Sequence, residues 1–197
     1  MFTGIVTHTG TVQAAKSGNG GGRLEIKADE GLGALGVGAS IACSGVCLTV
    51  SREGNGWFGV DISAETLART TISGWGAGTR INLERPLKMG DELGGHFVLG
   101  HVDGVAEITG CERDGDSVLL TVAAPTSLAA CIAKKGSVTL DGVSLTVNES
   151  SGSTFGVNLI PHTLLVTTLG NAESGARINF EVDPLARYVG RLWEADE

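Results

Sequence analysis

The sequence repeats itself, and a repeat of this length restricts the fold more than any other feature of the chain. The segment Gly45–Val50 (GVCLTV) returns 97 residues later as Gly142–Val147 (GVSLTV). At the same spacing, residues 61–67 match residues 158–164, and residues 78–82 match residues 175–179. Because so many matches occur in one order, we interpret the 197 residues as two copies of one structural unit.

The ends of the two copies are less regular than their centres. The opening segment, residues 2–6, pairs with residues 102–106 at a spacing of 100. This shift predicts three additional residues in the first hairpin of the N-terminal copy, near residues 17–22. A polar, glycine-rich stretch near residues 88–97 predicts the boundary. We assign residues 1–95 to an N-terminal unit, 96–184 to a C-terminal unit and 185–197 to a C-terminal helix.

Each copy has the pattern of a small antiparallel β-barrel. The 31 glycines are more than twice the usual share of about 7%, and their scatter among β-branched residues favours short strands joined by tight turns. Six short strands in roughly 90 residues suit a closed Greek-key barrel, because closure removes exposed sheet edges. We therefore predict an all-β protein of two tandem six-stranded barrels plus a short C-terminal α-helix. The expected elements are strands at 10–13, 24–27, 40–42, 47–50, 57–62 and 80–84, turns at 53–56 and 114–116, and helical turns at 64–69 and 126–133.

The C-terminal segment differs from the rest of the chain. Leu185, Tyr188, Val189 and Leu192 follow Pro184 at helical spacing, and proline favours the first turn of a helix. A short amphipathic helix with no further part of the chain to cover predicts packing against another subunit.

Charge and composition exclude several classes of protein. The net charge is −8 and no basic run exceeds Lys134-Lys135, which argues against a nucleic-acid partner. The apolar stretches are shorter than the roughly 20 residues that cross a bilayer, and the first residues lack the pattern of a secretory signal. The four cysteines form no CxxC pair, so we expect reduced thiols in a soluble, cytoplasmic protein.

Two barrels imply two similar pockets, so the informative residues are those that differ between the copies. Cys47 occupies the position that Ser144 holds in the other copy. Alternation along a strand places Cys47 with Thr49, and Ser144 with Thr146, on one face, which we expect to point inward. Such small polar groups bind a heterocycle or relay protons. The alternative is that Cys47 is a small buried side chain, the commonest fate of a free cysteine.

Two further residues are candidates for a part in proton transfer. His101 lies at the junction of the copies, and an imidazole exchanges a proton near neutral pH, which makes it a candidate base. His96 precedes it by five residues, but no further well-spaced ligand follows, so no metal site is predicted. A structural role for either histidine is the alternative. Asp183, beside Pro184, is either a helix N-cap or a group that orients a catalytic residue.

Taken together and in this order, the motifs resemble riboflavin synthase of the homotrimeric α-chain type. The resemblance covers nearly the whole chain. Two positions depart from the family's pattern: Ser44 stands where asparagine is expected, and Leu99 where a polar residue is expected. The motifs that carry the resemblance are residues 1–6, 44–50, 94–104, 141–147, 159–163 and 179–184.

The resemblance implies a dismutation that uses no cofactor and no metal. Two molecules of 6,7-dimethyl-8-ribityllumazine react, and a four-carbon unit passes from one to the other. The products are riboflavin and 5-amino-6-(D-ribitylamino)uracil, in the last step of riboflavin biosynthesis. The resemblance also implies a cytoplasmic homotrimer in which the N-terminal barrel of one subunit meets the C-terminal barrel of its neighbour, and a functional association with lumazine synthase.

The resemblance further implies which residues form the site. It makes His101 the base or proton relay, with Ser144 and Thr146 close by, and gives Cys47 and Asp183 a role in nucleophilic addition or proton transfer. Phe2 would pack on the ring system. The N-terminal barrel would contact lumazine through Gly4, Ile5, Val6, Cys47, Leu48, Thr49, Asp61, Ile62, Ser63, Ala64, Glu65 and Thr66. The C-terminal barrel would use Gly100, His101, Val102, Lys135, Ser144, Leu145, Thr146, Asn158, Leu159, Ile160, Pro161, His162 and Thr163.

Two other readings compete with a synthase. The first is an antenna protein on the same scaffold, which would bind a lumazine or flavin without chemistry and would keep ligand-binding residues in one barrel. Both copies here keep Leu-Thr-Val, and His101 and Ser144 are present, which favours the enzyme. The second is a flavin-binding barrel of a reductase, which would need a nicotinamide-binding βαβ unit that this chain has no room for.

Overall fold

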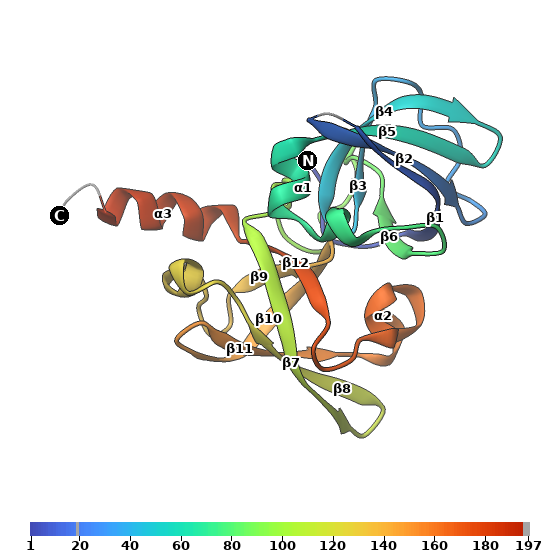
Figure 1. Ribbon diagram of the computed structural model, residues 1–197. Coiled ribbons are helices and arrows are strands. Elements are labelled where there is room, and N and C mark those ends of the chain that lie inside the picture. The colour runs from blue at the N-terminus through green and yellow to red at the C-terminus, as the bar shows by residue number, and fades with distance from the viewer. Residues whose placement is uncertain (19, 195–197) are drawn as a thin grey trace.

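The computed structural model describes residues 1–18 and 20–194, which form two closed β-barrels and a C-terminal helix (Figure 1). The strand order in the first barrel is β1-β2-β5-β4-β3-β6, and every neighbouring pair is antiparallel. All six strands and the helix predicted for this copy are present. The elements are β1 (His8–Gly18), β2 (Gly21–Ala28), β3 (Ser40–Cys43), β4 (Val46–Gly54), β5 (Trp57–Ser63), α1 (Ala64–Arg69), η1 (Thr71–Gly74) and β6 (Arg80–Glu84).

The second barrel repeats this topology, which confirms the predicted fold class. Its strands follow the equivalent order β7-β8-β11-β10-β9-β12 around the closed sheet. The predicted helical turn at 126–133 is a 3₁₀ helix over Thr126–Cys131. The elements are β7 (Gly104–Asp114), β8 (Ser117–Ala123), η2 (Thr126–Cys131), β9 (Ser137–Leu140), β10 (Val143–Ser151), β11 (Thr154–Leu159), α2 (Pro161–Val166), η3 (Thr168–Asn171) and β12 (Arg177–Val182).

The alignment of the repeats at their ends was predicted wrongly. β1 begins at His8 and β7 at Gly104, a spacing of 96, and the same spacing separates the starts of β2 at Gly21 and β8 at Ser117. The spacing becomes 97 at β3 and β9, so the second copy carries one additional residue between β8 and β9. The N-terminal copy therefore has no three-residue insertion in its first hairpin, of which residue 19 lies outside the described residues. Gly4 corresponds to Gly100, with φ of 76° and 75°, and not to Gly104.

Apolar side chains fill both barrels. Along β4, Val46, Leu48 and Val50 are buried in the first core, while Cys47 and Thr49 between them face the outside. In the second barrel Phe155 and Phe180 pack with their ring centroids 5.6 Å apart. Each fully buried side chain of this size contributes about 1.5–3 kcal/mol by leaving water, so each barrel has a core of its own.

Two asparagines join the barrels by equivalent hydrogen bonds. Asn82 donates to the carbonyl oxygen of Asp141 at 2.9 Å and accepts the N–H of Thr168 at 2.8 Å. Asn179 donates to the carbonyl oxygen of Ser44 at 2.9 Å and accepts the N–H of Thr71 at 2.8 Å. At the same place Gly45 and Gly142 pack so closely that a Cβ on either would lie under 3 Å from the other's backbone. The contact therefore requires glycine at both positions and holds the barrels in one arrangement.

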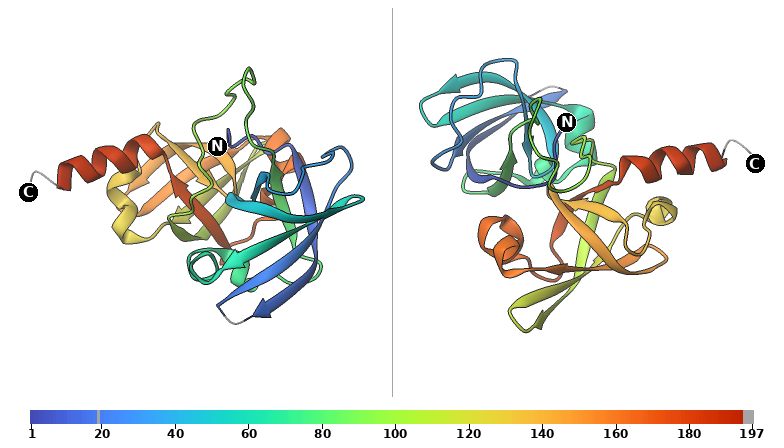
Figure 2. Two further views of the ribbon diagram at one scale, coloured as in Figure 1. Left: turned by 90° about the horizontal axis from the view of Figure 1, so that it is seen from above. Right: turned by 180° about the vertical axis from the view of Figure 1, so that it is seen from behind.

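The C-terminal helix α3 (Pro184–Glu194) begins at the predicted proline and projects away from both barrels (Figure 2). Leu185, Tyr188, Val189, Leu192 and Trp193 are all exposed along it. Residues 195–197, which were also assigned to this helix, lie outside the described residues. In the described part of the chain no helix has the length and apolar character needed to cross a membrane.

Candidate functional site

The small polar residues that differ between the copies lie on the outside of the barrels. Cys47 and Thr49 share one face of β4, and Ser144 and Thr146 share the equivalent face of β10, as strand alternation predicted. That face points outward, so the prediction of an inward face was wrong. The physical reason is that valine and leucine at the intervening positions occupy the interior.

Each of these two outer faces, which we call the N-terminal cleft (around Cys47) and the C-terminal cleft (around Ser144), is covered by a segment that comes from the other copy. The N–H of Cys47 donates to the carbonyl oxygen of Gly100 at 2.9 Å, and the N–H of Ser144 donates to that of Gly4 at 2.8 Å. A Cβ on Gly100 would lie 2.6 Å from that of Cys47, and one on Gly4 would lie 2.6 Å from that of Ser144. Within one chain, residues 4–6 therefore belong to the C-terminal cleft and residues 100–102 to the N-terminal cleft. This corrects the assignment of each segment to its own barrel.

The N-terminal cleft is a cavity of about 450 Å³. It brings together Cys47 from β4, Glu65 and Thr66 from α1, and the exposed side chain of His101. Ser63 begins α1 as its N-cap and accepts the N–H of Thr66 at 3.1 Å, which fixes the helix against the end of β5. The cleft thus holds a thiol, an imidazole, a carboxylate and a hydroxyl within one open space.

The C-terminal cleft holds a different histidine. His96 contacts the hydroxyl of Ser144 through Nδ1 at 2.7 Å and that of Thr139 through Nε2 at 3.2 Å. Burial lowers the pKa of His96, while the charge of nearby Asp183 raises it. His96, and not His101, is the imidazole beside Ser144 within one chain. Sequence reasoning considered His96 only as half of a weak metal pair, because its partners lie more than 40 residues away.

Asn158, at the end of β11, carries an unsatisfied polar group. Its side-chain oxygen is buried and has no hydrogen-bond partner, and a buried unpaired polar atom in a folded protein calls for an explanation. Asp61, the residue at the equivalent position in β5, is instead exposed and forms an ion pair with Arg23 at 2.8 Å. The orphaned oxygen of Asn158 is consistent with a ligand that donates a hydrogen bond at this point.

Several predicted residues lie where their side chains cannot line a cleft. Phe2 is fully buried against Ala42, Val98 and Cys47, so it supports the cleft from beneath and does not present its ring to a ligand. This corrects the prediction that Phe2 packs on the substrate. The side chains of Leu48, Ile62, Leu145 and Leu159 point into the barrel cores, which leaves only their backbone groups for recognition.

The remaining predicted residues lie at the edges of the clefts. Asp183 accepts the N–H of Leu185 at 2.9 Å, which is the N-cap alternative, and its charge also acts on His96. Lys135 is exposed before β9 with a φ of 67°, and its N–H bonds to the carbonyl oxygen of Val147. Ile160, Pro161 and His162 are exposed where β11 meets α2, while Thr163 is partly buried there.

Two buried carboxylates hold the crossing segments, and the sequence analysis did not single them out. Glu84 at the end of β6 accepts the N–H and hydroxyl of Thr3 and the N–H of Gly4. Glu181 on β12 accepts the N–H groups of Leu99 and Gly100. Burial raises the pKa of both carboxyls, that of Glu181 to about 7. Each glutamate therefore fixes the glycine segment that closes the other barrel's cleft.

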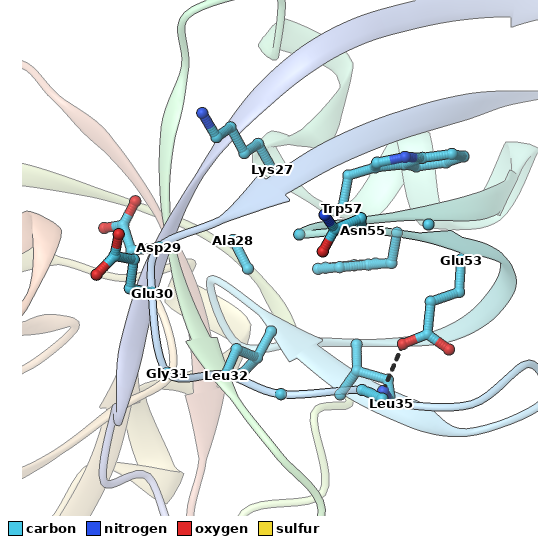
Figure 3. A pocket seen from close by; sticks show the side chains of 15 residues that line it. Lys27, Ala28, Asp29, Glu30, Gly31, Leu32, Leu35, Glu53, Asn55 and Trp57 are labelled. Atoms are coloured by element: carbon cyan, nitrogen blue, oxygen red, sulfur yellow. Dashed lines mark hydrogen bonds between the residues drawn. The ribbon is translucent and has the colours of Figure 1, made fainter.

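A larger cavity lies away from all of these residues. It encloses about 530 Å³ beside the hairpin of β4 and β5 and is lined by Leu32, Leu35 and Trp57, among others (Figure 3). Both oxygens of Glu53 accept backbone N–H groups of the β2–β3 loop, which leaves this carboxylate few free lone pairs. Among the described residues, no group of three or more His, Cys, Asp or Glu could hold a metal ion. None of the candidate catalytic residues lines this cavity.

Comparison with known proteins relates the chain to a family. The model of the lumazine-binding domain matches the chain twice, over residues 3–86 and 99–183. A riboflavin synthase of Brucella abortus (strain 2308) is 52% identical over 197 residues and covers 98% of each chain. A riboflavin synthase of Bacillus subtilis (strain 168) is 39% identical, covering 100% of this chain and 92% of its own.

Solved structures share the same double barrel. LumP complexed with riboflavin superposes with a TM-score of 0.85 at 25% identity, covering 92% of this chain and 99% of its own. LumP complexed with 6,7-dimethyl-8-(1'-D-ribityl) lumazine superposes with a TM-score of 0.83 at 24% identity. The chain is thus far closer in sequence to the synthases than to LumP, although it shares the fold of LumP.

Proposed function

The chain belongs to the riboflavin synthase family, and we propose that its two outer clefts are the two halves of one active site. The reaction is the dismutation of two 6,7-dimethyl-8-ribityllumazine molecules to riboflavin and 5-amino-6-(D-ribitylamino)uracil. The observation that carries the assignment of the site is the pair of equivalent strand faces at Cys47 and at Ser144, each covered by a glycine segment of the other copy. A reaction between two copies of one substrate needs two similar binding sites with unequal chemistry.

The unequal chemistry lies in the side chains that the two clefts present. Cys47 and His101 line the N-terminal cleft, while Ser144 and His96 meet in the C-terminal cleft. In the proposal, one lumazine loses a proton from its C7 methyl group and the other is attacked by a nucleophile at C7. His101 acts as base or proton relay, because its imidazole lines the N-terminal cleft and histidine is the side chain that most often transfers protons in enzymes.

The other catalytic candidates support these steps. Ser144 and Thr146 present hydroxyl groups on one face of β10, and His96 orients the Ser144 hydroxyl. Asp183 acts on His96 through its charge, and Cys47 supports the addition step in the opposite cleft. Backbone groups of residues 4–6, 47–49, 61–66, 100–102, 144–146 and 158–163, with Lys135, recognise the two ring systems in this proposal.

We propose that the complete site forms between neighbouring subunits of a homotrimer. The N-terminal cleft of one copy would face the C-terminal cleft of the next, so that His101 and Ser144 meet across the interface. The exposed apolar side chains of α3 support an assembly through this helix, since such a surface is costly to leave in water. Holding two lumazines in a reactive stack can supply roughly 7–11 kcal/mol of the barrier.

The cellular setting follows the family in the same proposal. The protein would work in the cytoplasm, with residues 1–95 and 96–184 as the two lumazine-binding units and residues 185–197 as the oligomerisation segment. A functional association with lumazine synthase would deliver the substrate where it is made.

The test uses the purified chain and 6,7-dimethyl-8-ribityllumazine alone, with riboflavin followed by absorbance and chromatography. We expect riboflavin and one equivalent of the aminouracil for every two lumazines consumed, at a rate unaffected by a chelator. Light scattering gives the subunit number of the same sample. If lumazine binds tightly and persists unchanged, the protein is a ligand carrier like the antenna proteins and the proposed activity is wrong.

A further inference from the structure

The C-terminal helix reaches the segment that closes the N-terminal cleft through one side chain. Arg187 on α3 donates two hydrogen bonds to the carboxylate of Asp103, from Nε at 3.2 Å and from Nη2 at 2.8 Å. The same terminal nitrogen donates to the carbonyl oxygen of His101 at 3.3 Å. One arginine therefore joins α3 to both His101 and Asp103, in the segment that lies over Cys47.

This ion pair differs from the others in the described part of the chain. The side chains of Arg187 and Asp103 are 27% and 17% exposed, whereas the side chains of the five other pairs are each at least 36% exposed. Exposed pairs contribute little because water and salt screen them, while bidentate, partly buried pairs fix geometry. Asp103 also accepts the N–H of Val182 at 2.9 Å, so the pair is tied to β12 as well as to α3.

We call the contacts of Arg187 with Asp103 and His101 the clamp. The equivalent segment of the other copy has no such contacts among the described residues. Thr7 corresponds to Asp103. The N–H of Thr7 donates to the carbonyl oxygen of Leu83 on β6, as that of Asp103 donates to Phe180 on β12, but threonine has no carboxylate to bind an arginine. That segment is instead held by Glu84, which receives three hydrogen bonds, one of them from the hydroxyl of Thr3. At the position of Thr3 the second copy has Leu99, which cannot donate from its side chain, so Glu181 receives two.

We infer that Arg187 is a positioning residue for the N-terminal half of the active site, holding the Gly100–Val102 segment over Cys47 from the C-terminal helix. The inference rests on the proposed function. Leu99 gives Glu181 no side-chain hydrogen bond, so this anchor is weaker than that of Glu84. Arg187 compensates by binding the same segment from α3. Because the apolar side of α3 is also the proposed contact between subunits, the clamp links assembly to the order of the His101 segment.

The primary test measures the order of the segment directly and needs no catalysis. The full-length protein is treated with iodoacetamide, and the alkylation rate of each cysteine is read from its peptide by mass spectrometry. Arg187→Ala should speed alkylation of Cys47 by roughly five-fold or more, because the clamped segment then opens locally. The exposed Cys111 is the internal reference and should react at an unchanged rate.

Three further variants separate the clamp from other effects. Asp103→Asn leaves the helix intact and should speed Cys47 alkylation as Arg187→Ala does. Leu99→Thr in the Arg187→Ala background should restore part of the protection by giving Glu181 a third donor. Arg80→Ala removes an equally short bidentate pair with Asp29 on the same barrel, far from the segment, and should leave Cys47 protected.

Activity provides the second measurement. In an active wild-type protein, Arg187→Ala should lower kcat by roughly ten- to hundred-fold, since a displacement of about 1 Å can cost that much. The subunit number, from light scattering, should match that of the wild type. The inference is wrong if Arg187→Ala and Asp103→Asn protect Cys47 as the wild type does, or if only Arg187→Ala exposes it, since the arginine would then act through assembly. An inactive wild type would overturn the proposed function and leave the alkylation result to decide the clamp.

Discussion

The two barrels share topology, core packing and the asparagine contacts between them, but they differ in the outer clefts. Both clefts are closed by a glycine segment from the other copy, anchored on a buried glutamate. His101 stands in the N-terminal cleft at the position that Ile5 holds in the C-terminal cleft. His96 contacts Ser144 in the C-terminal cleft, whereas in the described part of the chain no hydrogen bond to the Cys47 thiol is present. The difference indicates that the scaffold was kept symmetric while the reactive groups diverged.

This divergence suits a reaction in which two identical molecules take opposite roles. A symmetric pair of sites would treat both lumazines alike, so donor and acceptor of the four-carbon unit could not be distinguished. Placing an imidazole and a thiol in one cleft, and an imidazole bonded to a hydroxyl in the other, gives each molecule its own environment. The variants below test whether the asymmetry lies in these groups or elsewhere.

The largest effect is expected from the equivalent pair His101 and Ile5. His101→Ala should lower kcat by roughly 10²–10⁴-fold if the imidazole is a general acid–base catalyst. Ile5→Ala removes a side chain of comparable size from the equivalent position and should change kcat by less than about ten-fold, since no proton transfer is lost. Steady-state assays with lumazine measure both. Equal losses in the two variants would show that both positions only shape the clefts.

The next effect concerns the symmetric part of the molecule. Asn179→Ala leaves the carbonyl oxygen of Ser44 and the N–H of Thr71 without partners, and each such loss costs about 1–3 kcal/mol. Urea unfolding should therefore show a stability lower by about 2–5 kcal/mol. Asn82→Ala should give the same loss, because it breaks the equivalent pair of bonds. A loss in one variant alone would mean that the two contacts are not equivalent.

Sequence reasoning predicted the fold well and the site only in part. Internal repetition and strand alternation are local patterns, so they predicted both barrels and the shared face of Cys47 and Thr49. The crossing of each glycine segment to the other barrel depends on hydrogen bonds between residues dozens of positions apart. For the same reason the sequence analysis did not single out Glu84 and Glu181, whose partners are about 80 residues away. Only Leu99, noted as a departure from the family's pattern, drew attention to this region. It is the residue whose side chain gives Glu181 no hydrogen bond.

A pH experiment sharpens the comparison at the contact between the barrels. Asp141 accepts the N–H of Asn179, and burial raises its pKa to about 7, whereas Ser44 at the equivalent position does not titrate. Because this folded pKa lies above the unfolded value of about 4, the protonated carboxyl stabilises the fold. That contribution is fully present below pH 4 and is lost as the pH rises through 7.

The measurement compares the wild type with Asp141→Asn, whose amide can still accept the Asn179 N–H and does not titrate. The unfolding free energy of the wild type, relative to the variant, should fall between about pH 4 and pH 7 and level off above that, as determined by urea titration at each pH. Ser44→Ala serves as control and should shift stability equally at every pH. A difference between wild type and Asp141→Asn that stays constant with pH would show that Asp141 does not titrate in this range.

The smallest effect is expected at Ser44, where the family's pattern has asparagine. Ser44 has a φ of 41°, and its hydroxyl accepts the N–H of Asn82 at a rather long 3.2 Å, against 2.9 Å for the carboxylate of Asp141. Asparagine tolerates positive φ better than serine and has a longer side chain to reach the same N–H, so Ser44→Asn should raise stability by about 0.5–1 kcal/mol. Thermal unfolding should show a correspondingly higher Tm, with kcat unchanged because the residue lies at the contact between barrels and not in a cleft. A lower Tm would mean that the neighbouring backbone has adapted to serine, and the two copies would then be more independent than their shared topology suggests.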